Sequence, residues 1–332
     1  MKPRILTRDD APAAGLVLSR GVGPLQKGTV LSAESIAQLA SLPWKELQVL
    51  EMEPGDLHEE AAGRRLATGA AGEGVFVQPL AGGSWPLAAR HRGLVEVDEA
   101  LLARLNDSDD VAVVTLPSGQ IVIEQELIGR AKVVPFVTRE EEIARAEKLG
   151  PVLRVRPFQP LRVAALVQEG LDDASLEKFR AVFTEKLRFF GAPSPVVERV
   201  QGDPAPALRR CIADGAQLVA MAGSKLMDPS DPAVQALAKA GAKLEKHGVP
   251  LHPGTLLWVA SLDGVPIVGA PGCALFSRPT AFDLLLPMLL AGQKLTRAAL
   301  ARLGAGGLLT RDLAFRFPPY RPGAPRGELD PP

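Results

Sequence analysis

The pattern of apolar and polar positions changes near residue 155. Before it, residues 74 to 135 hold short runs such as VFVQPL, GLVEVD and VAVVTLP, separated by Gly, Pro, Asn or Asp. Such alternation predicts β-strands. After it, apolar strands alternate with segments of helical spacing: LRVAALV is followed by a helix that carries Leu176, Phe179 and Phe183 on one face. The chain therefore consists of a β-rich first half and a half in which strands and helices alternate.

This alternation predicts the fold class. We expect a three-layer α/β domain over residues 156–309, whose mostly parallel sheet is covered on both faces. A smaller β-rich α+β domain precedes it over residues 1–155, with a helix that begins at Ser32 and another over Glu99 to Leu105. In open parallel sheets the ligand crevice lies at the carboxyl ends of the strands, so candidate site residues are sought there.

Several further elements of the second half are predicted from local signals. A helix follows Asp231 in DPAVQALAKAG, and the strands TLLWVASLD and VPIVGAPG are joined by an Asp263-Gly264 hairpin turn. Helical spacing predicts helices from Ser277 to Ala291 and from Thr296 to Leu303.

Residues 310–332 form a proline-rich tail without a periodic apolar face. A disordered end is the expected state of such a segment. The alternative is an extended segment that lies along the body and is anchored by Phe315, Phe317 and Tyr320.

Composition narrows the class of protein. The 332 residues carry 38 basic and 38 acidic side chains, a formal net charge of zero. This balance argues against nucleic acid or an anionic membrane surface as a partner of the whole molecule. No run of 18 apolar residues and no secretory signal is evident, and two distant cysteines, Cys211 and Cys273, support no disulfide framework or zinc site. A cytoplasmic protein is expected.

The first loop that carries candidate chemistry is MAGSKLMDPSD, which follows a strand. Gly223 permits a close backbone approach, and Ser224 and Lys225 offer donors to an anion. Asp228 and Asp231 are the neighbouring carboxylates. Asp231 precedes a proline at a helix start, so it is either a helix cap or a ligand for Mg²⁺ beside a phosphate, and Asp228 is either a turn residue or a second carboxylate of that site.

The second loop, GAPGCALFSRP, also follows a strand. Gly269, Pro271 and Gly272 form a turn of small residues, and Ser277 is expected at a helix start. Taken alone, each loop is commonly structural. Because both fall at the carboxyl ends of strands, we expect them to converge on one anionic ligand.

These segments, in this order, resemble a known family. VAALV, LVAMAGSKLMDPSDPAVQAL, HGVPLHPGTLLW and GVPIVGAPGCALFS, between residues 161 and 309, resemble the molybdopterin-binding domain shared by molybdenum insertases, molybdopterin adenylyltransferases and gephyrin. GVPIVGAPG followed by a capped helix is the most specific part of the resemblance.

The resemblance implies a ligand and a set of site residues. Members of the family bind molybdopterin, a pterin with a dithiolene and a phosphate, and use Mg²⁺ in adenylyl transfer or molybdate insertion. It implies that Asp231 is the catalytic or metal-binding carboxylate. Asp228, the neighbouring carboxylate of the same loop, is a second catalytic candidate. Lys225 of the first loop is expected to bind the cofactor as a donor to its phosphate. The cofactor-binding residues that the resemblance implies are Gly223, Ser224, Pro253, Gly254, Gly269, Pro271, Gly272 and Ser277.

The functional expectation is therefore a protein of molybdenum cofactor biosynthesis or delivery. It would bind molybdopterin or its nucleotide conjugate, with Mg²⁺-dependent adenylyl transfer, hydrolysis or molybdate insertion as its chemistry. The alternative is a non-catalytic carrier that serves a nucleotidyltransferase or an apoenzyme. The expected partners are the small pterin or nucleotide ligand, maturation proteins of molybdenum enzymes and further copies of the same chain in a homo-oligomer.

Overall fold

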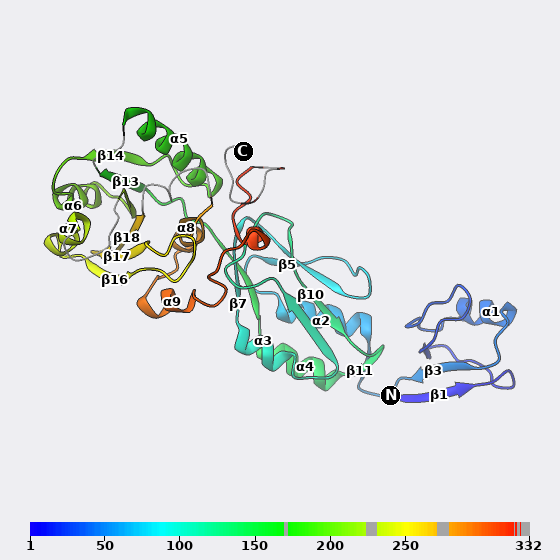
Figure 1. The fold of residues 1–332 in the computed structure, drawn as a ribbon. Helices are drawn as coiled ribbons and strands as arrows, with labels where there is room; N and C mark the ends of the chain where they lie inside the picture. Colours follow the sequence, from blue (N-terminus) through cyan, green and yellow to red (C-terminus); the bar gives the residue numbers. More distant parts are fainter. Residues whose placement is uncertain (169–171, 224–230, 271–278, 322, 324–325, 327–332) are drawn as a thin grey trace. The chain divides into compact units, whose positions relative to one another are not determined.

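The chain divides into two compact units, each described separately below. The computed structural model describes residues 1–168, 172–223, 231–270, 279–321, 323 and 326. Unit 1 comprises Met1–His91, Val95–Ser118 and Ile123–Val155, and unit 2 comprises Arg92–Leu94, Gly119–Val122 and Arg156–Pro332 (Figure 1).

Unit 1 begins with a small three-stranded antiparallel sheet of order β1-β3-β2. One helix, α1 (Ala33–Ser41), starts as the sequence predicts: the Ser32 hydroxyl accepts from the Ser35 amide and the Ser35 side chain accepts from the Ser32 amide. Leu18, Leu39 and Leu47 are buried between this helix and the strands. The strands are β1 (Lys2–Leu6), β2 (Val17–Leu18) and β3 (Leu47–Glu51).

The rest of unit 1 is built around a four-stranded antiparallel sheet of order β5-β6-β10-β8. Helix α2 (Glu59–Ala70) packs on it, and Arg65 of α2 forms ion pairs with Glu140 and Glu147 of helix α4 (Glu140–Leu149). The strands and the remaining elements are β4 (Asp56–His58), β5 (Val75–Val77), β6 (Trp85–Ala89), α3 (Glu99–Leu105), β8 (Val111–Thr115), β10 (Leu127–Val133) and β11 (Val137–Arg139).

Unit 2 contains a six-stranded mixed sheet of order β14-β13-β15-β18-β17-β16. The first three of these pairings are parallel, and the two at the β16 end are antiparallel. The prediction of an α/β fold with a large sheet is confirmed. The strands are β13 (Val163–Gln168), β14 (Val196–Val200), β15 (Leu218–Ala222), β16 (Lys243–His247), β17 (Trp258–Leu262) and β18 (Val265–Ala270).

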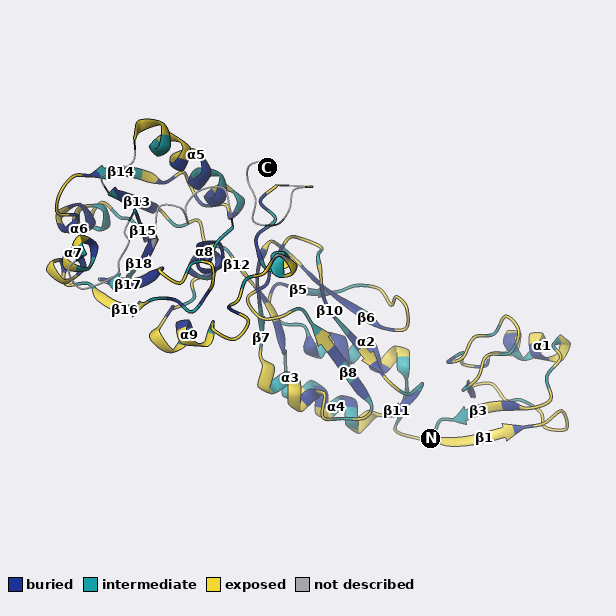
Figure 2. Ribbon diagram, viewed as in Figure 1, coloured by how far each residue is buried: buried dark blue, intermediate teal, exposed yellow. Residues whose placement is uncertain are grey.

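Alternate residues of the central strands are buried against opposite faces. Val163, Ala165 and Val167 belong to a core shared with α5 (Asp173–Phe189) and α8 (Phe282–Leu290). Leu166 belongs to a second core, shared with α6 (Ala205–Ala213) and α7 (Pro232–Ala240). Both faces of the sheet are therefore covered by helices, and the central strands are buried along their length (Figure 2).

Unit 2 also includes short segments from the first half of the chain. Strands β7 (Gly93–Val97) and β9 (Ile121–Val122) pair through Leu94 and Ile121, and both side chains are fully buried in the core that contains α5. Helix α9 (Arg297–Arg302) and a 3₁₀ helix over Arg311–Arg316 follow α8. Strand β12 (Leu153–Pro157) lies at the boundary of the two units.

The structure differs from the prediction in the start of one helix and in one additional strand. The helix expected from Ser277 begins at Phe282, because the amide of Thr280 donates to the Asp283 carboxylate and the Thr280 hydroxyl accepts from the Phe282 amide. These bonds define the first turn five residues later than the spacing suggests. The second difference is the edge strand β16, which lies in the segment KLEKHGVP and is not among the predicted strands.

Candidate functional site

The order of strands in unit 2 creates a switch point. The chain runs from β13 to β14 on one side, and then returns through α6 to β15 on the other side of β13. Parallel strands that diverge in this way leave a crevice at their carboxyl ends, which is where α/β proteins bind ligands. Gln168, Val200 and Ala222 are the last residues of these three strands.

A cavity of about 440 Å³ opens at this carboxyl edge. It is formed by the ends of β13 and β14, by the residues that precede α6 and by one side of α7 from Pro232 to Lys239. Its lining residues are Gln168, Val200, Gly202, Asp203, Pro204, Pro232, Gln235 and Lys239. This volume is within the range of pockets that hold small molecules.

Three helices begin at this edge, and an aspartate accepts from the first turn of each. Asp172 and Asp231 are the N-caps of α5 and α7, whereas Asp203 precedes Pro204, the N-cap of α6. The carboxylates of Asp172, Asp203 and Asp231 accept from the amides of Ser175 in α5 (2.7 Å), Ala205 in α6 (3.1 Å) and Ala233 in α7 (2.9 Å). A carboxylate at a helix start satisfies an amide and interacts favourably with the helix dipole. Asp231 is thus the N-cap of α7, one of the two roles predicted from the sequence, and its Oδ1 accepts the hydrogen bond from the Ala233 amide.

The polar rim of the cavity includes one ion pair. Lys239 Nζ lies 2.9 Å from Asp203 Oδ2, while the other oxygen of Asp203 accepts from the Ala205 amide at the start of α6. The Ala205 amide, and then Lys239, hold the pKa of Asp203 below its usual value. Asp203 is therefore an anion in the neutral pH range, and its charge is balanced by Lys239 on the same rim.

Gly223 directly follows β15 and has a positive φ of +88°. A Cβ atom placed on it would lie 3.6 Å from Cβ of Gln168, the last residue of β13. Gly223 and the cavity-lining Gln168 are therefore neighbours at the switch point. The left-handed backbone conformation of Gly223 is by itself enough to favour glycine at this position.

The Pro253-Gly254 turn lies against the start of α8. The carbonyl of Pro253 accepts from the Ala281 amide at 3.3 Å. A Cβ atom on Gly254 would lie 2.5 Å from Cβ of Ala281, and Gly254 has φ +121°. Both features require glycine at this position for reasons internal to the fold.

Gly269 is required by its neighbour in the sheet. It pairs with Trp258 of β17, and the indole lies across it on the face covered by α6 and α7. A Cβ atom at Gly269 would lie 1.7 Å from Cε2 of Trp258, which is fully buried. Packing in the sheet therefore accounts for glycine at this position of the GAPG motif.

The remaining predicted site residues lie outside the described residues. They are Ser224, Lys225, Asp228, Pro271, Gly272 and Ser277. Sequence reasoning missed the cavity residues Gln168, Asp203 and Lys239. The signal for Asp203 was available, since Gly202-Asp203-Pro204 follows a strand and precedes a helix, the same pattern as Asp231-Pro232.

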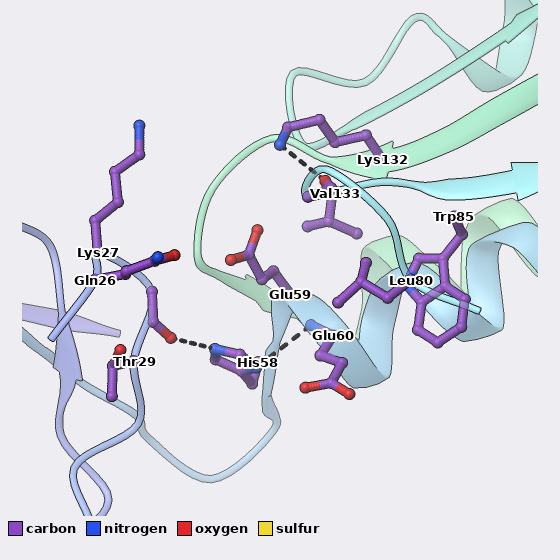
Figure 3. A pocket seen from close by; sticks show the side chains of 12 residues that line it. Gln26, Lys27, Thr29, His58, Glu59, Glu60, Leu80, Trp85, Lys132 and Val133 are labelled. Atoms are coloured by element: carbon purple, nitrogen blue, oxygen red, sulfur yellow. Dashed lines mark hydrogen bonds between the residues drawn. The ribbon is translucent and has the colours of Figure 1, made fainter. Parts of the chain in front are cut away.

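Unit 1 has a smaller pocket of about 220 Å³ that the sequence did not suggest. Figure 3 shows His58 at its base, with Glu59 and Glu60 beside it and Trp85 and Leu80 on the far wall. His58 Nε2 lies 2.9 Å from the Gly28 carbonyl, and its Nδ1 accepts from the Glu60 amide at 3.3 Å. Together these contacts require the tautomer with its proton on Nε2, so His58 is the N-cap of α2.

Replacing His58 tests this cap. His58→Ala removes the acceptor for the Glu60 amide, and we expect a loss of about 1 kcal/mol in the free energy of unfolding. His58→Asn keeps a good capping group and should recover most of that loss. Urea denaturation of the three proteins measures the difference, and equal destabilisation by Ala and Asn would contradict the capping role.

Other candidate chemistry is sparse in the described part of the chain. There, no three His, Cys, Asp or Glu side chains are grouped as a metal site, and no helix is long and apolar enough to cross a membrane. Burial raises the pKa of the Cys211 thiol to about 11, so this cysteine is protonated at neutral pH and is a poor nucleophile.

The fold defines an α/β unit with a cavity at the carboxyl edge of its sheet. No family model and no curated protein matches the chain. Among solved structures, the crystal structure of a molybdopterin biosynthesis MoeA protein from Pyrococcus horikosii is similar to it over 75% of this chain and 81% of that one, with 13% sequence identity and a TM-score of 0.30.

Proposed function

We propose that unit 2 binds molybdopterin, or its nucleotide conjugate, at the carboxyl edge of its sheet, and that the protein acts in molybdenum cofactor biosynthesis or delivery. The observation that carries the proposal is the cavity at the β13 switch point, which is lined by Gln168, by the residues before α6 and by one side of α7. The sequence resemblance over residues 161–309 supplies the identity of the ligand. In this proposal unit 2 is a domain of the molybdopterin-binding type.

The predicted residues have distinct parts in this proposal. Gly223 brings the backbone after β15 close to the ligand, with Ser224 and Lys225 as donors to its phosphate. In this proposal the second loop, with Pro271, Gly272 and Ser277, and the Pro253-Gly254 turn would contact the ligand from the other side. Because Mg²⁺ is commonly held by one or two carboxylates together with substrate phosphates, Asp231 fits a magnesium ligand through the oxygen that does not cap α7, and Asp228 would assist it. Bound Mg²⁺ would neutralise charge on the phosphate.

Binding can be tested on the full chain. We expect native mass spectrometry of protein isolated from a host that makes molybdopterin to show the added mass of the pterin, and the added mass to disappear when the host cannot make it. Purified ligand should bind with micromolar affinity or better, about 8 kcal/mol of binding free energy. A bare chain from both hosts, together with no binding in titration, would refute the proposal.

Asp231→Asn separates an enzyme from a carrier. Asparagine caps helices well, so the free energy of unfolding should change by about 1 kcal/mol or less. If Asp231 holds Mg²⁺ during catalysis, turnover of an adenylated pterin should fall about a hundredfold or more, with ligand affinity changed far less. Turnover and thermal unfolding are measured on the same preparations.

The matched control for this substitution is Asp172→Asn, which changes the same kind of cap on α5. It should leave turnover unchanged. Equal turnover in wild type and Asp231→Asn would exclude the catalytic assignment. A wild-type protein that binds the pterin without turnover would identify a carrier.

A further inference from the structure

Two aromatic side chains after Leu309, Phe317 and Tyr320, belong to the core of unit 2. Phe317 and Tyr320 are only 5% and 7% exposed. The Tyr320 ring meets Phe189 and Phe190 edge-on, with centroid distances of 5.4 and 6.0 Å. The Gln120 side chain donates to the Phe315 carbonyl. The segment thus lies along the body through Phe317 and Tyr320, as the second alternative from sequence has it, but it is not extended throughout: residues 311–316 form a 3₁₀ helix, and Phe315 is exposed.

Tyr320 also reaches a buried ion pair. Its hydroxyl donates to Asp283 Oδ1 at 2.7 Å, and Lys186 Nζ lies 2.7 Å from the same oxygen. Both charged side chains are fully buried. Burial, and then the charge of Asp283, raise the pKa of Tyr320 well above its usual value, so the hydroxyl stays protonated and can donate.

The second oxygen of Asp283 fixes the start of α8. It accepts from the Thr280 amide at 2.9 Å, and the Thr280 hydroxyl accepts from the Phe282 amide at 3.2 Å. Asp283 thus joins three parts of unit 2 through one carboxylate: α5 through Lys186, the C-terminal segment through Tyr320, and the first turn of α8.

That first turn supports the Pro253-Gly254 turn. Ala281 donates its amide to the Pro253 carbonyl, and its methyl group lies so close to Gly254 that a side chain there would overlap it. A shift of Ala281 must therefore move the turn or break its hydrogen bond. Continuous contacts lead from the Tyr320 hydroxyl through Asp283 and Ala281 to Gly254.

We propose that Tyr320 is a positioning residue: through Asp283 and Ala281 its hydroxyl sets the place of the Pro253-Gly254 turn. The ring alone would fill the aromatic cluster, as phenylalanine does at positions 189 and 190, and the hydroxyl is the group that reaches Asp283. The consequence for a ligand rests on the proposed function, in which this turn faces molybdopterin. Tyr320 then acts on the ligand through the turn and not by touching the ligand itself.

Hydrogen exchange in the full chain tests this proposal. Tyr320→Phe keeps the ring and removes the donor. We expect amide exchange to accelerate roughly tenfold in peptides covering residues 279–286 and 251–257, while exchange in the central strands of the sheet changes little. The matched control is Phe317→Leu, which loosens the same segment without touching Asp283, and which should accelerate exchange within residues 311–321 only.

Two outcomes would overturn the proposal. In one, Tyr320→Phe accelerates exchange only within residues 311–321; in the other, Phe317→Leu affects the turn as strongly as Tyr320→Phe does. Titration of both proteins with molybdopterin separates this proposal from the proposed function. If the wild-type protein does not bind molybdopterin, the proposed function is refuted and the exchange result still stands. If Tyr320→Phe leaves both the amide exchange of the turn and the affinity for molybdopterin unchanged, only the positioning role is refuted.

Discussion

Gly269→Ala is expected to destabilise unit 2 by about 3 kcal/mol or more, because the new methyl group would overlap the indole of Trp258. A Cβ atom at position 269 would lie 1.7 Å from Cε2 and 2.0 Å from Nε1 of that ring. Trp258 is fully buried between the sheet and the helices α6 and α7, so the indole has no open space into which it can turn. Relief requires the strands β17 and β18 to separate.

The measurement is thermal or urea unfolding of Gly269→Ala, Trp258→Leu and the double variant. Trp258→Leu alone leaves a cavity and should also destabilise. In the double variant the alanine methyl group occupies part of the space that the indole leaves, so the two effects should be clearly less than additive. Additive losses, or a Gly269→Ala protein with wild-type stability, would show that the indole is not what excludes a side chain at position 269.

This packing bears on how much of the site could be predicted from sequence. The GAPG motif was interpreted as a ligand loop, and the roles of its residues in binding stay predictions. For Gly269, however, the structure supplies a sufficient reason in the opposite strand. Two residues that are eleven positions apart meet only once the hairpin is formed, so a motif by itself does not distinguish close approach to a ligand from close approach to a tryptophan.

Local signals predicted individual elements well. The hairpin turn at Asp263-Gly264 joins β17 to β18 as expected, and both turn residues have positive φ. Asp231 caps α7, and α5 buries Phe179 and Phe183. These features depend on interactions within a few residues, or on the period of a helix, and both are visible in one sequence.

Features that depend on distant contacts were missed. The start of α8 is set by Asp283, a charged residue buried beneath the C-terminal segment. Leu94 and Ile121, in the β-rich half, are buried in the core of unit 2. Composition and periodicity carry no information about such pairings. The proline-rich end offered Tyr320 as one anchor in an alternative interpretation, but nothing in the sequence pointed to its partner Asp283.

Lys186→Met is expected to destabilise unit 2 by about 3–5 kcal/mol, since it removes one partner of a fully buried ion pair. A lysine beside Phe183 and Leu187 would usually lie in solvent, but here its ammonium group meets Asp283 at 2.7 Å. Without it, the Asp283 carboxylate keeps neutral donors: the Tyr320 hydroxyl and, from Thr280, the amide and the more distant hydroxyl at 3.5 Å. The melting temperature should fall by on the order of 10 °C.

The control replaces the whole cluster with apolar side chains: Lys186→Met, Asp283→Leu and Tyr320→Phe together. Apolar residues of similar volume often substitute for a buried ion pair at little cost, so the triple variant should recover more than half of the stability lost in Lys186→Met. The Thr280 amide loses its acceptor in this variant, which is why full recovery is not expected. If the triple variant is as unstable as the single one, the defect of Lys186→Met is the loss of lysine packing. If the triple variant recovers stability, the defect of Lys186→Met is the isolated charge of Asp283. The ion pair then fixes the arrangement of α5, α8 and the C-terminal segment, but it does not supply most of their stability.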